Sequence, residues 1–287
     1  MASVPALLKW IGNKQRVAEE IVSYMPDCFN NYYEPFLGSG AVMAQLYKQV
    51  QETGKPQFKQ GFGSDILPFL IEIFNTVKND PEKMIEYYDK EISEYYNDPI
   101  KKYCEIRERF NINHNAFDFC LLSRTCYGGV VRFRKADGFM STPRGPHKPI
   151  SPISFSQRAT LWNGLIKNAS FDVMPFADSM DRAQPGDVIY CDPPYTYSQS
   201  IIYGSQTFKI DQLFEKIAEC KERGAFVMLS INGSRESNRK DISIMPPKGL
   251  FSRNIAINCG TSMIDRLQNA GNTMKEENVV DRLMLTW

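Results

Sequence analysis

The stretch Val188-Ile189-Tyr190-Cys191-Asp192-Pro193-Pro194-Tyr195 is the strongest indication of the fold. Its first four residues are apolar, and a short apolar run that ends abruptly predicts a buried strand of a parallel sheet. The two prolines end the strand because they donate no backbone N–H to a neighbouring strand. Asp192 and Tyr195 are therefore expected at the carboxyl end of a central strand, where open α/β sheets bind their ligands. A plain stiff turn is the alternative, and the double proline between an acid and a tyrosine favours a functional site.

The rest of the chain alternates apolar strands with amphipathic helices, which predicts an α/β fold with a Rossmann-like sheet. Further strands are expected near residues 32–34, 62–65, 171–174, 225–231, 251–257 and 279–287. Helices are expected near residues 41–47, 67–77 and 212–222. A polar helical segment from Asp80 to Phe110 interrupts this succession. We therefore expect a catalytic domain formed by residues 1–79 and 165–287, and an insertion formed by residues 80–164.

Composition argues against several classes of protein. With 287 residues, of which 43% are hydrophobic and 23% charged, the chain is typical of a globular protein. It has no apolar run long enough to span a bilayer and no signal-peptide pattern, so no membrane contact is expected. Its seven cysteines form no Cys-x-x-Cys pair, and it has only two histidines. This pattern favours a reducing compartment and argues against a metal site.

Positive charge is concentrated in one part of a chain whose formal net charge is only +1. Residues 121–168 contain eight Lys or Arg and one acid, a balance of +7, whereas residues 80–120 have a balance of −4. Inside this basic block, Val130 to Arg134 alternates apolar and basic side chains, and a turn at Lys135–Gly138 leads to a predicted returning strand at Phe139–Ser141. A two-stranded ribbon with arginines on one face can enter a DNA groove. A solvent-exposed hairpin is the alternative.

A glycine-rich turn lies between the first predicted strand and helix. Gly38 and Gly40 permit close approach of a ligand to the backbone. However, Met43 stands where a Gly-x-Gly-x-x-Gly motif has its third glycine, which weakens a dinucleotide site. Asp65 ends the next strand 25 residues after Gly40, a spacing at which an acid commonly binds ribose hydroxyls; capping of the next helix is the alternative. Lys14, near the start of the first helix, suits an anionic ligand, although an ordinary surface lysine is the simpler interpretation.

Three stretches in this order resemble Dam-like DNA adenine-N6 methyltransferases of the D12 class, alpha group. They are Lys9–Lys14 (KWIGNK), Glu34–Gly40 (EPFLGSG) and Asp192–Tyr195 (DPPY). The resemblance implies a Rossmann-like S-adenosylmethionine-dependent methyltransferase sheet with an inserted, mostly helical target-recognition domain that carries a β-hairpin. It also implies site-specific transfer of a methyl group from S-adenosylmethionine to the N6 amino group of an adenine flipped out of duplex DNA. The second product would be S-adenosylhomocysteine.

The resemblance also implies a cofactor site. Trp10 and Lys14 would contact the methionine part of S-adenosylmethionine, with Lys14 pairing with its carboxylate. Asp65 would bind the ribose and Asp178 the adenine edge. The family often has an aromatic residue after the acid that matches Asp178, whereas this chain has Ser179, so stacking on the adenine is expected from another residue, such as Phe176. The full implied set is Trp10, Lys14, Glu34, Phe36, Gly38, Ser39, Gly40, Asp65, Ile66, Phe176, Asp178 and Asp192.

The third stretch carries the implied chemistry, which needs no metal. Adenine N6 is a poor nucleophile because its lone pair is delocalised into the ring. Asp192 and the carbonyl of Pro193 would accept its two hydrogens, and the prolines, including Pro194, would fix these acceptors before reaction. Tyr195 would stack on the flipped base. Transfer would be a direct displacement without a covalent enzyme intermediate.

DNA contacts are expected from the basic block. Arg132 and Arg134 are expected to read base edges, since arginine binds guanine through two hydrogen bonds. The full expected set is Arg124, Tyr127, Arg132, Arg134, Lys135, Arg144, Lys148 and Arg158. The expected partner is double-stranded DNA, and the expected location is the cytoplasm, with a bacterial or phage origin. No obligate protein partner is indicated, and a cognate restriction endonuclease acting separately is left open.

Several alternatives stay open at this point. Cytosine-N4 methylation would use the same Asp-Pro-Pro-Tyr stretch, although the order of the motifs favours adenine. A catalytically silent DNA-binding relative is a second alternative, against which the intact Asp192, Gly38 and Gly40 argue. A nucleotide-binding oxidoreductase is the third, and Met43 at the third-glycine position disfavours it. RNA or protein amide methylation is less consistent with the basic ribbon.

Overall fold

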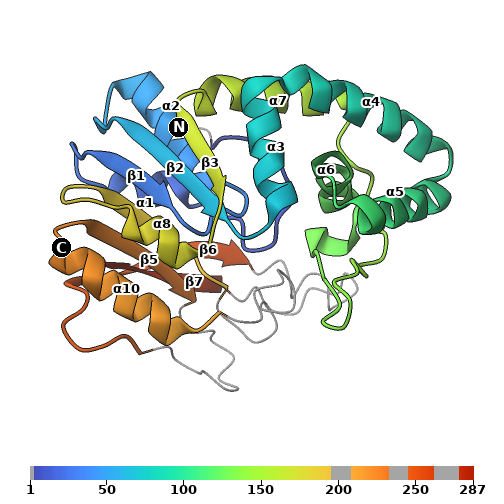
Figure 1. Ribbon diagram of the computed structural model, residues 1–287. Helices are drawn as coiled ribbons and strands as arrows, with labels where there is room; N and C mark the ends of the chain where they lie inside the picture. Colours follow the sequence, from blue (N-terminus) through green and yellow to red (C-terminus); the bar gives the residue numbers. More distant parts are fainter. Residues whose placement is uncertain (1–2, 195–207, 233–244, 262–277) are drawn as a thin grey trace.

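The computed structural model describes residues 3–194, 208–232, 245–261 and 278–287. Seven strands within these ranges form one sheet. They are β1 (Asn31–Glu34), β2 (Gln60–Asp65), β3 (Ala169–Val173), β4 (Val188–Cys191), β5 (Phe226–Asn232), β6 (Arg253–Thr261) and β7 (Asn278–Leu285). Their order in the sheet is β3-β2-β1-β4-β5-β7-β6 (Figure 1). Strands β1 to β5 run parallel, whereas β7 is antiparallel to both of its neighbours. The predicted mixed α/β architecture is confirmed.

Some helices connect the parallel strands, and others form a group at one side of the sheet (Figure 1). They are α1 (Ala18–Ser23), α2 (Ala41–Thr53), α3 (Pro68–Asn79), α4 (Pro81–Asn97), α5 (Pro99–Asn113), α6 (Ala116–Thr125), the 3-10 turn η1 (Tyr127–Gly129), α7 (Pro152–Ile166), α8 (Phe176–Asp181) and α10 (Ile210–Glu222). Within the described ranges, every helix is too short or too polar to cross a lipid bilayer.

Strand β4 has the bounds that its apolar sequence predicts. All four of its side chains are buried, because it lies between β1 and β5 with helices on both faces of the sheet. The strand order reverses between β1 and β4. Open α/β sheets bind ligands outside the carboxyl ends of the strands at such a reversal. Asp192, the residue after β4, is therefore at the place where this topology favours a site.

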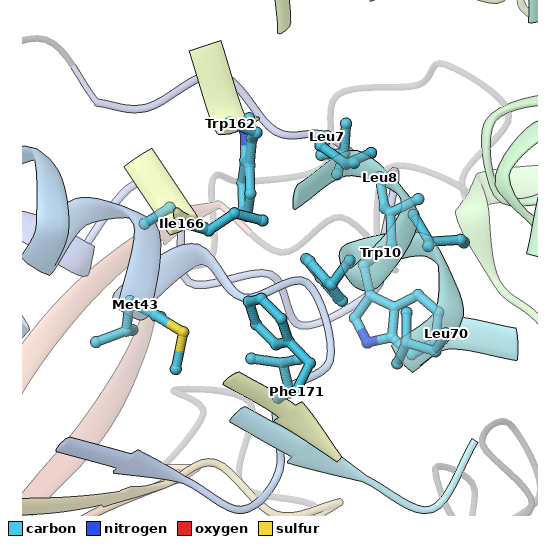
Figure 2. Packing of buried hydrophobic residues seen from close by; sticks show 14 of the residues in the cluster. Leu7, Leu8, Trp10, Met43, Leu70, Trp162, Ile166 and Phe171 are labelled. Carbon is cyan, nitrogen blue, oxygen red and sulfur yellow. The ribbon is translucent and has the colours of Figure 1, made fainter. Parts of the chain in front are cut away.

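Two apolar cores cover the two faces of the sheet. The larger one joins the sheet to α1 through α7, and the smaller one joins it to α8 and α10. Figure 2 shows part of the larger core, in which Leu7 and Leu8 of the N-terminal segment pack with Trp162 and Ile166 of α7 and with Phe171 of β3. The N-terminal segment is thus held by the same core as the sheet.

The predicted insertion forms the group of helices beside α3 in Figure 1. Helix α7 leads back to the sheet and contacts α2, α3 and α4. Tyr88 of α4 stacks on Phe155 of α7 with ring centroids 3.9 Å apart, and Phe119 of α6 packs edge-on to Trp10. Because these side chains belong to the core that covers the sheet, the helices are packed onto the sheet and do not form an isolated unit.

The predicted ribbon in the basic block is shorter than expected. Between the two predicted strands, Phe133 and Met140 form a β-bridge, and backbone hydrogen bonds join Arg134 N to Phe139 O and Ser141 N to Arg132 O; a second bridge, between Cys126 and Arg144, lies outside these strands. The ladder stops there because the amide of Arg132 donates to the hydroxyl of Thr142, not to a backbone carbonyl. The two predicted strands are thus a minimal hairpin.

Candidate functional site

A cleft of about 1030 Å³ opens at the carboxyl ends of β1, β2 and β4. The segment before α1, the loops after these three strands, the start of α8 and one side of α10 form its walls. Such a volume is ample for a drug-sized ligand. Most of the predicted cofactor and catalytic residues line it, namely Trp10, Lys14, Glu34, Phe36, Gly38, Ser39, Asp65, Ile66, Phe176, Asp192, Pro193 and Pro194.

Two residues of the predicted cofactor site do not line this cleft. Asp178 lies in the first turn of α8 and is exposed, whereas Phe176 and Ala177 face the cleft. Successive helical residues point about 100° apart, so the helix that brings Phe176 to the cleft turns Asp178 to solvent. Gly40 is the N-cap residue directly before α2 and has φ +64°. A Cβ there would lie 3.2 Å from Phe74. Its small size serves packing and the turn, and the cleft of the described residues includes neither Asp178 nor Gly40 among its lining. Tyr195 lies outside the described residues.

An ion pair between Asp192 and Lys14 lies at the centre of the cleft. Lys14 Nζ donates a 2.8 Å hydrogen bond to Asp192 Oδ1, and the two side chains are 7% and 19% exposed. Burial raises the pKa of Asp192 to about 6, although Lys14 opposes the shift. Burial disfavours the charged form of Lys14, but the neighbouring carboxylates outweigh it and raise its pKa above the ordinary value. Asp192 is therefore ionised at neutral pH, and Lys14 pairs with it.

Glu34, the last residue of β1, places a second carboxyl group in the cleft. Its side chain is buried, and Tyr32 donates a 2.8 Å hydrogen bond from its hydroxyl to Oε2. Burial raises the pKa of Glu34 to about 8, with the nearby Asp192 adding to the shift and the Tyr32 hydroxyl opposing it. The two carboxyl groups thus differ at neutral pH, since Asp192 is charged and Glu34 is largely protonated.

The glycine turn after β1 is tied to the end of β2. Gly38 has φ +47°, and a Cβ there would lie 3.1 Å from Trp10 Nε1, so a side chain would crowd the cleft wall. The amide of Gly38 donates to Asp65 Oδ2 at 3.1 Å, and that of Leu67 donates to Oδ1 at 3.2 Å. Burial raises the pKa of Asp65 to about 6, although both amides oppose the shift. Asp65 therefore lines the cleft and also holds the backbone just before α3, although the N-cap residue of that helix is Leu67 and not Asp65.

Three phenylalanines form an aromatic wall. Phe36 and Phe176 are stacked, with ring centroids 5.2 Å apart and an interplanar angle of 21°. Phe208, just before α10, lies edge-on to both rings at 5.7 Å. The sequence motifs did not identify Phe208, and its position directly before an amphipathic helix was the only available signal. The wall offers a flat apolar surface to a ring-shaped ligand.

The hairpin displays basic side chains on one face. Val131 and Phe133 are buried, whereas Arg132, Arg134 and Lys135 are exposed, so the predicted alternation is confirmed. The guanidinium of Arg134 pairs with Asp137 at 2.6 Å, and this guanidinium also lies over the ring of Phe139.

The other basic residues of this region are placed differently. Tyr127 is exposed. Arg144, which is half-buried, and Lys148, which is exposed, line a separate pocket of about 310 Å³ beside α4 and α5. The guanidinium of Arg144 donates to the carbonyl of Gly145 at 2.7 Å. Both cations therefore lie on the surface of the insertion and away from the cleft.

Two predicted DNA-binding arginines instead hold the N-terminal segment. Arg124 of α6 is buried, and its guanidinium donates to the carbonyls of Ala6 and Leu7. Arg158 of α7 also donates to Ala6 O at 2.8 Å. Because a buried guanidinium that satisfies backbone carbonyls cannot also reach a phosphate, the prediction for Arg124 is corrected. Its hydrogen bonds hold the segment that carries Trp10 into the cleft.

Asp281 of β7 is a further acid near the cleft that the sequence did not identify. Its Oδ2 lies 3.6 Å from Lys14 Nζ, and its side chain is buried. An acid inside a largely apolar closing strand gives no motif, so only the three-dimensional structure reveals this contact.

Comparison with known proteins agrees with this site. A family described as "D12 class N6 adenine-specific DNA methyltransferase" matches residues 10–251. The DNA adenine methylase of Vibrio cholerae serotype O1 is 28% identical over 281 residues, covering 91% of this chain and 94% of that protein. A type II methyltransferase of Methanocaldococcus jannaschii is 28% identical over 254 residues, covering 79% of this chain and 84% of that protein. The DNA adenine methylase of Serratia marcescens is 30% identical over 197 residues, covering 66% of each chain.

These matches decide between the alternatives that the sequence left open. The matched family is specific for adenine N6, which argues against cytosine-N4 methylation and against an oxidoreductase. The relatives are named as methylases or methyltransferases, which argues against a silent DNA-binding module. The chain belongs to the D12 class of N6 adenine-specific DNA methyltransferases.

Proposed function

We propose that the cleft binds S-adenosylmethionine together with a flipped adenine, and that Asp192 accepts hydrogens of the adenine amino group during methyl transfer. The supporting observation is a largely buried carboxylate at the reversal of the strand order, held by Lys14 and followed by two prolines. Burial raises the pKa of Asp192 to about 6, so this group is charged at neutral pH and a better hydrogen-bond acceptor than an exposed carboxylate.

The residues after β4 would prepare the amino group for attack. Asp192 and the carbonyl of Pro193 accept hydrogen bonds from its two N–H groups, which favours a pyramidal nitrogen with a localised lone pair. S-Adenosylmethionine supplies an electrophilic methyl group and leaves as S-adenosylhomocysteine, the sulfur keeping the electrons of the broken C–S bond. N6 forms the new N–C bond and loses one proton, which Asp192 passes to solvent. Pro193 and Pro194 keep both acceptors in place, so little reorganisation is needed during reaction.

The lining residues fit S-adenosylmethionine chemically. The carboxylate of Asp65 suits ribose hydroxyls, and the stacked rings of Phe36 and Phe176 suit the adenine ring. Gly38 keeps open the wall next to Trp10, where a Cβ would intrude. The ammonium of Lys14 suits the methionine carboxylate, although it pairs here with Asp192. Asp178 and Gly40 are left out of this proposed set because neither lines the cleft.

We propose that residues 80–164 form the target-recognition domain and bind double-stranded DNA. The supporting observation is the exposed basic face of the hairpin, with Arg132 and Arg134 on the side opposite Val131 and Phe133. Unstacking the target adenine costs a few kcal/mol, which contacts in the cleft would offset.

We further propose, from the relatives in bacteria and Escherichia phage P1, that the protein acts in the cytoplasm. If the protein belongs to a restriction-modification system, a separate restriction endonuclease would recognise the same DNA sequence.

Replacement of Arg132 by alanine is expected to change sequence preference more than overall DNA affinity. A bidentate arginine–guanine contact contributes about 1–3 kcal/mol of discrimination against the wrong base. Methylation of a panel of duplexes that differ at single positions around the target adenine should therefore become about tenfold less selective at one position.

The matched control is Lys135→Ala on the same hairpin. It should weaken binding to all duplexes about equally and reduce the slope of log K against log salt by about one. An Arg132→Ala enzyme with the sequence preference of the wild type would remove Arg132 from the reading face.

A further inference from the structure

Asp281 occupies an unusual position for a carboxylate. It lies on β7 between Asn232 of β5 and Ile257 of β6, inside the sheet, and its residue is only 6% exposed. Its Oδ1 is buried without a close hydrogen-bond partner among the described residues, and the thiol of Cys259 on the neighbouring strand β6 faces the same carboxyl group. Burial of a carboxylate is costly unless a partner compensates it. Asp281 also lies beyond residues 10–251, which match the family.

The compensating group is Lys14, which Asp281 shares with Asp192. Lys14 Nζ lies 2.8 Å from Asp192 Oδ1 and 3.6 Å from Asp281 Oδ2, and it also donates to the carbonyl of Gly12 at 3.3 Å. One ammonium thus lies between two carboxylates that come from different strands, β4 and β7. The three charges sum to −1, and because all three side chains are largely buried, the electrostatic interactions between them are stronger than in water.

We propose that Asp281 is a positioning residue for methyl transfer, which anchors the Lys14 ammonium and keeps it from fully neutralising the carboxylate of Asp192. This inference rests on the proposed role of Asp192 as the acceptor for the adenine amino group. Without the charge of Asp281, the attraction that draws the Lys14 ammonium away from Asp192 would be lost. The carboxylate of Asp192 would then be better stabilised as an anion and a weaker acceptor for the amino hydrogens.

The groups around Asp192 support this division of roles. Lys14 faces it from the segment before α1, Asp281 from β7, Glu34 from β1 and Tyr190 from β4. Burial is the largest cause of the raised pKa of Asp192, Lys14 lowers it, and Asp281 raises it. Asp281 therefore acts on Asp192 in the direction opposite to Lys14.

The test is the Asp281→Asn variant, which keeps the shape of the side chain and removes its charge. Single-turnover methyl transfer to duplex DNA, with S-adenosylmethionine prebound, should be measured between pH 5 and pH 8. The wild-type rate should fall as the pH drops through about 6, where Asp192 takes up a proton. In Asp281→Asn, the rate at the neutral-pH plateau should fall about three- to tenfold. The decline of the rate at low pH, here called the acid limb, should move to lower pH. In separate steady-state assays, the KM for S-adenosylmethionine should stay within about twofold of the wild-type value.

Asp187→Asn is the matched control for a structural effect. Asp187 is also a buried aspartate, and it lies directly before β4. It accepts hydrogen bonds from the backbone amides of Asn31 and Gln184. This control should lower the melting temperature without moving the acid limb. Asp281→Glu, which restores the charge, should recover part of the wild-type rate and acid limb.

Two results for Asp281→Asn would overturn the inference. A lower rate with an unmoved acid limb would show a purely structural role. A raised KM for S-adenosylmethionine with an unchanged plateau rate would show a role in cofactor binding. A third result would concern the wild type. If its rate did not fall at low pH, the proposed role of Asp192 would be lost, and the inference about Asp281 with it.

Discussion

Replacement of Asp192 by asparagine is expected to slow methyl transfer about 10³-fold, or about 4 kcal/mol in activation free energy, while S-adenosylmethionine still binds. The amide keeps the size of the carboxylate but loses its charge, and an NH2 donor takes the place of one of the two acceptor oxygens. The adenine amino group then loses the acceptor that localises its lone pair. Single-turnover transfer of labelled methyl groups and calorimetric titration with the cofactor measure the two quantities separately.

Asp178→Asn makes the same chemical change outside the cleft. Because Asp178 is exposed and does not line the cleft, this control should transfer methyl groups at the wild-type rate. If Asp192→Asn retained a rate within tenfold of the wild type, the proposed mechanism would be lost.

Replacement of Lys14 by methionine is expected to weaken both function and folding. The variant leaves the buried carboxylates of Asp192 and Asp281 without their shared cation, and breaking a buried ion pair in this way costs about 3–5 kcal/mol. Methyl transfer should fall about 10²-fold because the acceptor is misplaced and partly protonated. Chemical denaturation and single-turnover kinetics measure these losses.

The loss of stability in Lys14→Met should depend on pH in a defined direction. Without Lys14, the carboxylate of Asp192 loses its neighbouring cation, so burial raises its pKa in the folded state further above the unfolded value. A carboxyl group with a raised folded pKa contributes stability at low pH that is lost as the pH rises through that pKa. The deficit relative to the wild type should therefore be larger at pH 8 than at pH 5.

Lys102→Met in the insertion is the matched control. Lys102 is also a buried lysine between two acids, with Glu91 Oε2 at 3.1 Å and Glu94 as its second partner. Its replacement should lower stability but leave methyl transfer per folded molecule unchanged. An equal loss of transfer in both variants would mean that Lys14 acts only through folding.

Much of the catalytic region could be predicted from the sequence because its residues follow strands with strong local signals. The apolar run before two prolines fixed β4 as Val188–Cys191, and parallel strands bring their carboxyl ends together. Asp192, Glu34 and Asp65 therefore meet at one edge of the sheet although they are far apart in the sequence. The glycine turn at Gly38 likewise depends on local backbone conformation.

The corrected residues depend on facts that local patterns do not carry. Asp178 is one position away from Ala177, which faces the cleft, and a motif cannot fix the rotation of a short helix to within one residue. A count of basic residues does not separate Arg124, which binds backbone carbonyls, from Arg132, which is exposed. Asp281 meets Lys14 only because β7 inserts between β5 and β6, a long-range pairing that no local signal in the sequence predicts.

The most direct test of the central claim is the identity of the methylated base. The wild-type protein would be incubated with methyl-labelled S-adenosylmethionine and mixed-sequence duplex DNA, and the DNA would then be digested to nucleosides and separated. We expect label in N6-methyladenine from the wild type and a strongly reduced amount from Asp192→Asn. Label in N4-methylcytosine, or wild-type levels of N6-methyladenine from Asp192→Asn, would contradict the central claim.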